Sequence, residues 1–232
     1  MPIETVPSRS DPIRAWAEVL NKFVDDSGRI DFQGLKHDRT ALDEYVAYVA
    51  STGFDAFPRR DDLIAHHINA YNALAMWAVL EKGIQLTHAG LNKVLFFYNT
   101  KMKIGKTDLS LYAYENDFIR PLGEERVHFA LNCMAVSCPR LPKKPFSGKD
   151  LQQELDRETR LFLAEPRNLR IDRENKTVWL SEILDFYPED FLKKAPSVTA
   201  YVARYDKRLI PGTYEVRFIP YDWRINDSSR IR

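Results

Sequence analysis

RDDLIAHHINAYNALAMWAVLEK, residues 60–82, is the longest stretch of the chain with a continuous helical pattern. Its central part, residues 68–74, is apolar on nearly every side of a helix, and a helix of that kind is usually buried. Gly83 follows directly, and glycine commonly ends a helix. The segment therefore predicts one long, buried helix.

Shorter patterns surround this helix. Pro12 after Asp11 is typical of a helix start, and the inward positions of the helix at 148–163 are expected to be Leu151, Leu155, Leu161 and Phe162. Apolar spacing predicts helices at residues 13–24, 39–50, 112–120, 148–163, 188–194 and 197–205. Extended segments are predicted at residues 29–32, 126–131 and 216–219, with hairpins at 101–111 and 169–180.

These elements indicate one α+β domain with a helix-rich N-terminal half and a small mixed or antiparallel sheet. A chain of 232 residues suits one large domain, because single cores grow to roughly 250 residues before they split. We expect a flexible arm at residues 1–10, the domain at 11–227 and a short tail at 228–232.

The composition excludes several classes of protein. A hydrophobic fraction of 44% is enough for a packed core, and a formal net charge of +1 argues against nucleic acid as the main partner. No apolar run approaches the ~20 residues of a membrane-spanning helix, and the first twenty residues lack the apolar region of a signal peptide. The chain as given is expected to be soluble: periplasmic or secreted if a leader has been removed, and otherwise cytoplasmic.

Neither a metal nor a cofactor is expected. Two cysteines are too few for a self-contained zinc site. The adjacent pair His66 and His67 is unlike a helical metal motif, in which ligands stand at i and i+4.

The reactive side chains concentrate in residues 128–139, HFALNCMAVSCP. A thiol becomes a nucleophile when a nearby base or positive charge stabilises its thiolate, and His128 is the nearest base in sequence to Cys133. Direct pairing of the two needs a bend near Asn132, because residues five apart on a strand face opposite ways. Cys138 is the rival thiol. Two alternatives remain open here, a Cys133–Cys138 disulfide and two inert, buried thiols.

Polar residues inside the long helix form a second group. Asn69 and Asn72 are three residues apart and share a face, where buried amides must bond to a loop, to neighbouring backbone or to a ligand. Tyr71 lies between them. In the helix at 112–120, Glu115 is a carboxylate that could orient an imidazole, or that could form a surface ion pair with Arg120.

Four separated motifs together resemble the DUF547 family, a family named for having no assigned function. They are INAYNAL (68–74), SLYAYENDFIR (110–120), RVHFALNC…SCPRL (126–141) and YDW-x-x-N (221–226), and the resemblance spans about residues 16–226. It implies a bacterial protein with a fold and site similar to papain-like and transglutaminase-like thiol enzymes.

The resemblance also implies roles for individual residues. Glu115 would orient His128, His128 would deprotonate Cys133 as the first choice of nucleophile, and Asn132 or nearby backbone amides would form an oxyanion hole. The sequence departs from the family at His66 and His67, where members usually carry an aromatic pair.

The leading hypothesis is a cysteine-dependent hydrolase or acyltransferase that acts on an amide of a small peptide. Its predicted catalytic residues are Cys133, His128 and Glu115, and its predicted substrate-binding residues are Asn69, Tyr71, Asn72, Arg126, Asn132 and Cys138. Arg120, Arg126 and Arg140 lie near the thiols in sequence and favour an anionic ligand such as a glutathione-like peptide. The alternatives are a non-catalytic module that binds a peptide or thiol ligand and a purely structural domain.

Overall fold

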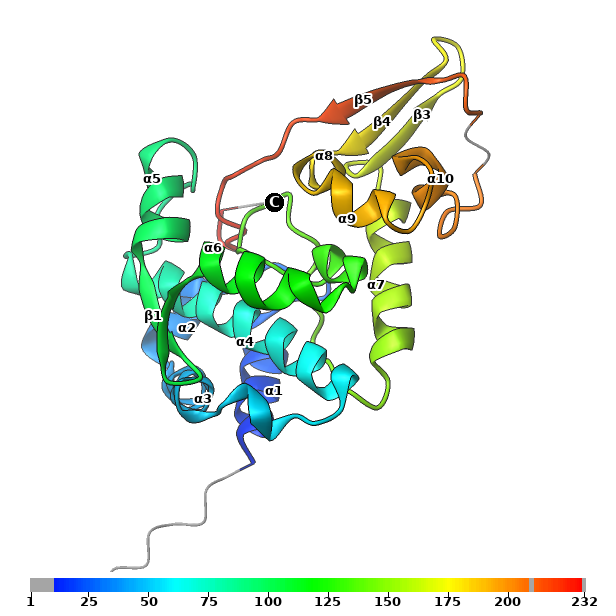
Figure 1. The fold of residues 1–232 in the computed structure, drawn as a ribbon. Helices are drawn as coiled ribbons and strands as arrows, with labels where there is room; N and C mark the ends of the chain where they lie inside the picture. The colour runs from blue at the N-terminus through cyan, green and yellow to red at the C-terminus, as the bar shows by residue number, and fades with distance from the viewer. Residues whose placement is uncertain (1–10, 209–210, 231–232) are drawn as a thin grey trace, which may run out of the picture.

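The long helix predicted from the sequence is α4, Arg60–Glu81, and it runs through the middle of the helical body (Figure 1). The computed structural model of the protein describes residues 11–208 and 211–230, so the predicted arm at residues 1–10 lies outside the described residues. Every residue of α4 from Ile64 to Met76 is buried, as expected of a helix that is apolar all round.

The helices and strands have the following bounds. The helices are α1 Pro12–Phe23, α2 Phe32–His37, α3 Thr40–Ser51, α4 Arg60–Glu81, α5 Leu91–Val94, α6 Leu111–Tyr114, α7 Leu151–Ala164, α8 Ile183–Phe186, α9 Pro188–Leu192 and α10 Val198–Val202. The strands are β1 Lys101–Ile104, β2 Thr107–Ser110, β3 Leu169–Asp172, β4 Thr177–Ser181 and β5 Glu215–Ile219.

In the helical body, α3 packs against α4 on one side and against the amphipathic helix α1 on the other. The Asp11 side chain accepts a hydrogen bond from the N–H of Ile13 and caps α1, and Pro12 occupies the first turn. Trp16 of α1 stacks on Tyr45 of α3 with ring centroids 5.7 Å apart. Such aromatic stacking helps to hold α1 against α3, and α6 and α7 also pack against α4.

A smaller lobe follows α7 and contains the mixed sheet (Figure 1). Strand β4 lies in its centre, antiparallel to β3 and parallel to β5. The helices α8 to α10 pack beside this sheet around a second apolar cluster that includes Phe162, Leu180 and Phe191. β1 and β2 form a separate antiparallel hairpin. The predicted class is therefore confirmed: a helix-rich α+β domain with small sheets.

The strand predicted at residues 126–131 is wrong. Residues Glu125–Phe129 form a 3-10 helix, and the Glu124 side chain accepts a hydrogen bond from the N–H of Arg126 at its start. Because Val127 to Ala135 are all buried, the apolar run carries no periodicity that distinguishes a strand from a turn of helix. The chain then continues as an irregular segment, residues 130–139, which we call the cysteine loop.

Other differences are local. The predicted extended piece at residues 29–32 is limited to two isolated bridges of Ile30, because Asp31 caps α2 and Phe32 begins it. Leu161, expected to face inward, is 38% exposed. The short helices α2, α5 and α8 were not predicted, since four to six residues are too few to establish a helical period.

The segment after β5 returns across the helical body. Ala135 of the cysteine loop pairs with Ile225, and Thr87 pairs with Arg224, each in an isolated bridge. The N–H of Ser228 donates to the carbonyl of Ile30 at 2.9 Å. This return path carries the aromatic residues that follow β5 to the cysteine loop. Within the described residues, no helix combines the length and apolar character needed to cross a membrane.

Candidate active site

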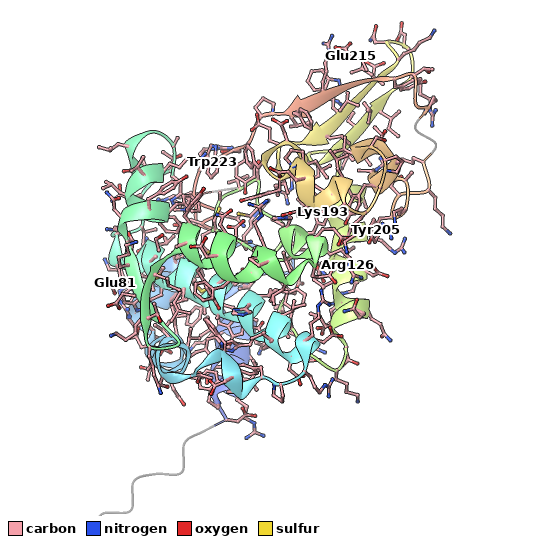
Figure 2. All side chains as sticks on the ribbon, in the orientation of Figure 1. Glu81, Arg126, Lys193, Tyr205, Glu215 and Trp223 are labelled. Carbon is pink, nitrogen blue, oxygen red and sulfur yellow. The ribbon has the colours of Figure 1, made fainter. Side chains whose placement is uncertain are left out.

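One small cavity, of about 70 Å³, collects most of the reactive groups predicted from the sequence. Glu115, His128, Cys133 and Cys138 all line it, together with Tyr71 of α4. Most of the remaining lining is aromatic or aliphatic: Phe97, Leu131, Ile183, Phe186, Tyr187, Tyr221 and Trp223. Figure 2 shows Trp223 on the return segment between α5 and the small lobe. The cavity therefore lies where helical body, small lobe and return segment meet.

Two buried asparagines hold the cysteine loop in place. The N–H of Asn132 donates to Asn72 Oδ1 at 2.7 Å, and Asn72 Nδ2 donates to the carbonyl of Ala130 at 3.0 Å. The Asn132 side chain in turn bonds to the carbonyl of Pro139 and to the N–H of Met134, each at 2.7 Å. Both amides thus satisfy backbone groups of the loop, as buried polar groups must.

The structure places the amides predicted to bind substrate outside the lining of this cavity. Asn69 bonds through both amide atoms to the backbone of Phe146, at 2.8 and 2.9 Å. Asn69, Asn72 and Asn132 are 2%, 1% and 0% exposed, and none of them lines the cavity. All three position backbone segments: Asn132 Nδ2 donates to the carbonyl of Pro139, and its Oδ1 accepts from the N–H of Met134.

The loop contains a backbone conformation that is uncommon for a residue with a side chain. Met134 has φ of 71°, in the left-handed region. The N–H of Cys138 donates to the carbonyl of Ala135 at 3.1 Å, which folds the second half of the loop back toward the first. Such conformations persist only where surrounding contacts enforce them, and here the turn carries Cys138 back to Cys133.

The two thiols are free and in contact, with the Sγ atoms 3.1 Å apart. Cys138 Sγ also accepts hydrogen bonds from the N–H of Cys133 and from the hydroxyl of Tyr221, both at 3.1 Å. Hydrogen bonds donated to a sulfur stabilise its thiolate. The hydrogen bonds are therefore donated to Cys138 Sγ, and Cys133 is one of the residues that donate them.

The pKa values of the two thiols move in opposite directions. Burial would raise the pKa of Cys138, but hydrogen bonds from the Cys133 thiol, the Tyr221 hydroxyl and backbone groups outweigh burial and lower it. The hydrogen bond to Cys138 raises the pKa of Cys133, and burial raises it further. The geometry therefore favours Cys138 as the thiolate, whereas the sequence placed Cys133 first.

The carboxylate that holds His128 is Asp190 of α9. His128 Nε2 lies 3.0 Å from Asp190 Oδ2, and the imidazole stacks on Tyr187 with centroids 4.0 Å apart. Hydrogen bonds from His128, Arg120 and Lys193 lower the pKa of Asp190 despite burial, so this carboxylate stays charged. Because Nε2 is engaged, Nδ1 is the ring nitrogen that remains for a thiol or substrate.

Sequence reasoning missed Asp190 and assigned its role to Glu115. Glu115 Oε2 instead accepts a hydrogen bond from the hydroxyl of Tyr71 at 3.1 Å, and Tyr187 lines the same cavity. Burial raises the pKa of both tyrosines, which keeps them protonated as donors. The only sequence signal at Asp190 is an acidic residue in the first turn of a helix, with nothing to connect it to a histidine 62 positions earlier.

The three arginines expected near the thiols are all engaged with carboxylates and do not line the cavity. Arg120 pairs with Asp190, Arg126 with Glu124 and Asp156, and Arg140 with Glu158. Arg126, predicted to bind substrate, lines a separate polar pocket together with Tyr205; both residues are labelled in Figure 2. The three arginines are thus close to the cysteines in sequence but are not part of the cavity that the cysteines line.

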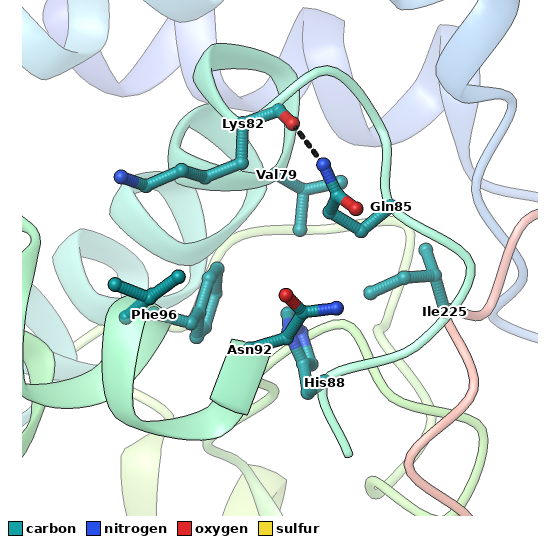
Figure 3. Close-up of a pocket in the computed structure, with 8 residues that line it drawn as sticks. Val79, Lys82, Gln85, His88, Asn92, Phe96 and Ile225 are labelled. Carbon is teal, nitrogen blue, oxygen red and sulfur yellow. Dashed lines mark hydrogen bonds between the residues drawn. The ribbon is translucent and has the colours of Figure 1, made fainter. Parts of the chain in front are cut away.

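A second small cavity, also of about 70 Å³, is lined by residues that include Val79, Lys82, Gln85, His88, Asn92, Phe96 and Ile225 (Figure 3). Its floor includes His88, whose ring lies 3.9 Å from that of Phe96. Burial lowers the pKa of His88 to about 4, so it is neutral at pH 7, and its Nε2 lies 2.9 Å from the carbonyl oxygen of Cys133. A neutral imidazole bonds to a carbonyl as the donor, so His88 holds the backbone of Cys133.

His66 and His67 lie on α4 away from the cysteine loop. His66 stacks on Phe57 with centroids 4.2 Å apart, and its Nε2 is buried without a hydrogen-bond partner. His67 Nδ1 lies 2.7 Å from the hydroxyl of Tyr114. Neither histidine lines the thiol cavity. In the described part of the chain, no cluster of histidine, cysteine or acidic side chains could hold a metal ion.

Comparison with known proteins identifies one family. The model of a family described as "Protein of unknown function, DUF547" matches residues 55–163. The match covers Glu115, His128 and both cysteines, while Asp190 and Tyr221 lie beyond it. No curated protein and no solved structure matches the chain significantly.

Proposed function

We propose that this chain, a member of the DUF547 family through residues 55–163, is a cysteine-dependent hydrolase or acyltransferase that acts on an amide bond of a small peptide. The observation that carries the proposal is a single cavity lined by two contacting thiols and by an imidazole whose second nitrogen is held by a carboxylate. Nucleophile, base and orienting group are the three parts of a thiol-enzyme site.

In this proposal, Cys138 is the nucleophile. Its thiolate attacks the carbonyl carbon of the amide, and the electron pair of the carbonyl moves to oxygen. Protonated His128 then gives its proton to the departing amine, which leaves an acyl group on Cys138. Asp190 stabilises the charged imidazole before that transfer, as the third member of a triad does.

Release of the acyl group uses the same base. His128, now neutral, takes a proton from water or from an acceptor amine, which attacks the acyl carbon and frees the Cys138 sulfur. Water as the acceptor makes the protein a hydrolase, and an amine makes it an acyltransferase. Cys133 stabilises the thiolate through its N–H and its thiol and takes no part in acyl transfer.

The cavity restricts the substrate. A volume of about 70 Å³ admits a small acyl group, and its walls are mostly aromatic rings. Glu115 is the carboxylate in this lining, and no arginine or lysine joins it among the described residues. We therefore propose a neutral acyl group, with any anionic group of a glutathione-like peptide lying outside the cavity.

The test is release of amine from a panel of short peptide amides, glutathione included, by the parent protein and four variants. Cys138→Ala and His128→Ala are expected to lose most of the activity, whereas Cys133→Ala keeps part of it. His37→Ala is the matched control, because His37 is an exposed imidazole that contacts the carbonyl of Gln33 at 2.7 Å. Full activity in a folded Cys138→Ala protein would overturn the assignment of the nucleophile.

The alternative is a module that binds a peptide or thiol ligand in this cavity without turnover. It predicts saturable binding by the parent protein and by both cysteine variants, with no amine released from any substrate. That result would leave the cavity as a binding site and remove the hydrolase proposal.

A further inference from the structure

The contact between the two thiols has a consequence beyond acyl transfer. A nucleophile for amide hydrolysis needs one thiol, and this cavity holds two, with Sγ atoms 3.1 Å apart. A disulfide bond is about 2.05 Å long, so the sulfur atoms need to approach by only about 1 Å to become bonded. The loop already presents both side chains to the same point.

We propose that Cys133 and Cys138 form a redox-active dithiol that reduces a small disulfide and retains the oxidation as an internal disulfide. This activity goes beyond the proposed acyl transfer and does not depend on it. The oxidant is a disulfide of two low-molecular-mass thiols, and the reductant that restores the dithiol is a small thiol.

The reaction proceeds in two steps. The Cys138 thiolate attacks one sulfur of the small disulfide, a new S–S bond forms, and the first small thiolate leaves. Cys133 then gives up its proton to a departing thiolate and attacks Cys138 Sγ, which forms the internal disulfide and expels the second small thiolate. In sum, one small disulfide, the Cys138 thiolate and the Cys133 thiol yield one small thiol, one small thiolate and the internal disulfide.

The hydrogen bonds assign the two roles. The N–H of Cys133 and the hydroxyl of Tyr221 both donate to Cys138 Sγ, which prepares Cys138 as the attacking sulfur. Tyr221 lies farther from Cys133 Sγ, at 3.9 Å. Cys133 therefore keeps its proton until Cys138 has reacted, which is the behaviour of a resolving thiol.

The surroundings limit the oxidant to a small molecule. Cys133 and Cys138 are 8% and 3% exposed, and the cavity above them holds about 70 Å³. A disulfide within a folded protein would need this space to widen considerably. His88 bonds to the carbonyl of Cys133 and so holds the backbone of the cysteine loop. Formation of the disulfide therefore requires the two side chains to move rather than the whole loop.

The experiment equilibrates the reduced protein with glutathione buffers of increasing oxidised fraction, alkylates the remaining thiols in acid-quenched samples and measures intact mass. The expected product is a protein that has lost two hydrogens and carries no glutathione. Protein that carries only glutathione adducts, or that resists oxidation until it is unfolded, would overturn the proposal.

Two variants test the order of the steps. Cys133→Ser is expected to stop as a mixed disulfide on Cys138, and Cys138→Ser to react with oxidised glutathione at least tenfold more slowly. The reverse order of rates would overturn the assignment of roles. Circular dichroism shows whether each variant folds. If a variant does not fold, the titration of the parent protein still tests whether the internal disulfide forms.

This measurement is independent of amide hydrolysis. A protein that cleaves no amide but forms the internal disulfide supports the dithiol and removes the hydrolase. A protein that cleaves amides and forms only glutathione adducts gives the opposite result.

Discussion

The thiol cavity and helix α4 each contain a buried histidine, and the two sites differ in what surrounds the imidazole. In the thiol cavity, His128 bonds to Asp190 and lies near two contacting cysteines. On α4, His66 is equally buried, but its Nε2 has no partner, and burial lowers its pKa to about 4. Burial keeps the ring of His66 neutral, whereas the buried ring of His128 is oriented by a fixed carboxylate.

The largest effect is expected when the carboxylate of Asp190, which distinguishes His128 from His66, is removed. Asp190→Asn keeps the size of the side chain but removes the charge that orients and stabilises His128. We expect amide cleavage to fall by about 100-fold or more, by analogy with the loss of the acid in other triads. The measurement is kcat/KM for the best peptide amide. An unchanged value would make His128 another inert ring of the kind seen on α4.

The stability of the protein is expected to fall in acid because of His66 on α4. The unfolded chain protonates histidine near pH 6.5, but folded His66 stays neutral until about pH 4. Its stabilising contribution is thus fully present above pH 6.5 and is lost as the pH falls toward 4. At 1.36 kcal/mol per pKa unit, the loss is about 3 kcal/mol.

His66→Phe should remove that part of the acid sensitivity. Urea denaturation at pH 7 and at pH 4.5 measures the free energy of unfolding, and the variant is expected to lose about 2 kcal/mol less than the parent between those pH values. His37→Ala serves as the exposed control. An identical acid loss in parent and His66→Phe would contradict the burial argument.

A smaller effect separates the two thiols. Tyr221→Phe removes the hydroxyl that donates to Cys138 and leaves the ring in place. Hydrogen bonds to charged groups are worth about 1.5–3 kcal/mol, so alkylation of Cys138 at neutral pH should slow by at least about tenfold. The rate for each cysteine is read from peptide masses. A slower reaction at Cys133 alone would assign the thiolate to the other sulfur.

The smallest effect on activity is expected at His88, a buried histidine that holds the cysteine loop but does not line the thiol cavity. His88→Leu leaves the carbonyl of Cys133 without its donor and should lower the free energy of unfolding by about 1–3 kcal/mol. Amide cleavage should change less than it does in Asp190→Asn. Urea denaturation and kcat/KM together check this ranking, and a larger activity loss than that of Asp190→Asn would reverse it.

Sequence patterns predicted an element correctly where its hydrophobic period was long enough to detect or where a capping residue marked its start. The buried helix α4, the Asp11–Pro12 start of α1 and both hairpins were predicted at nearly their observed bounds. Residues 126–131 were misassigned, because a run that is buried on all sides has no period. The family was also recognised correctly from its motifs.

The candidate site could be predicted only in its composition. His128 and the two cysteines lie within eleven residues, so a single segment revealed them. The cost of burying amides predicted that Asn72 has a partner but left open whether this is loop backbone or a ligand. Asp190 and Tyr221 come from elements 62 and 83 positions away from their partners, and no local signal links such residues.

The sequence by itself determined the helix-rich class, the long buried helix and the segment that carries the thiols, because each depends on neighbours along the chain. Tertiary structure alone decided which carboxylate reaches His128 and which sulfur receives the hydrogen bonds. Those choices depend on where the small lobe and the return segment meet the cysteine loop. Packing of distant segments sets that meeting point, and hydrogen bonds act only at contact distance.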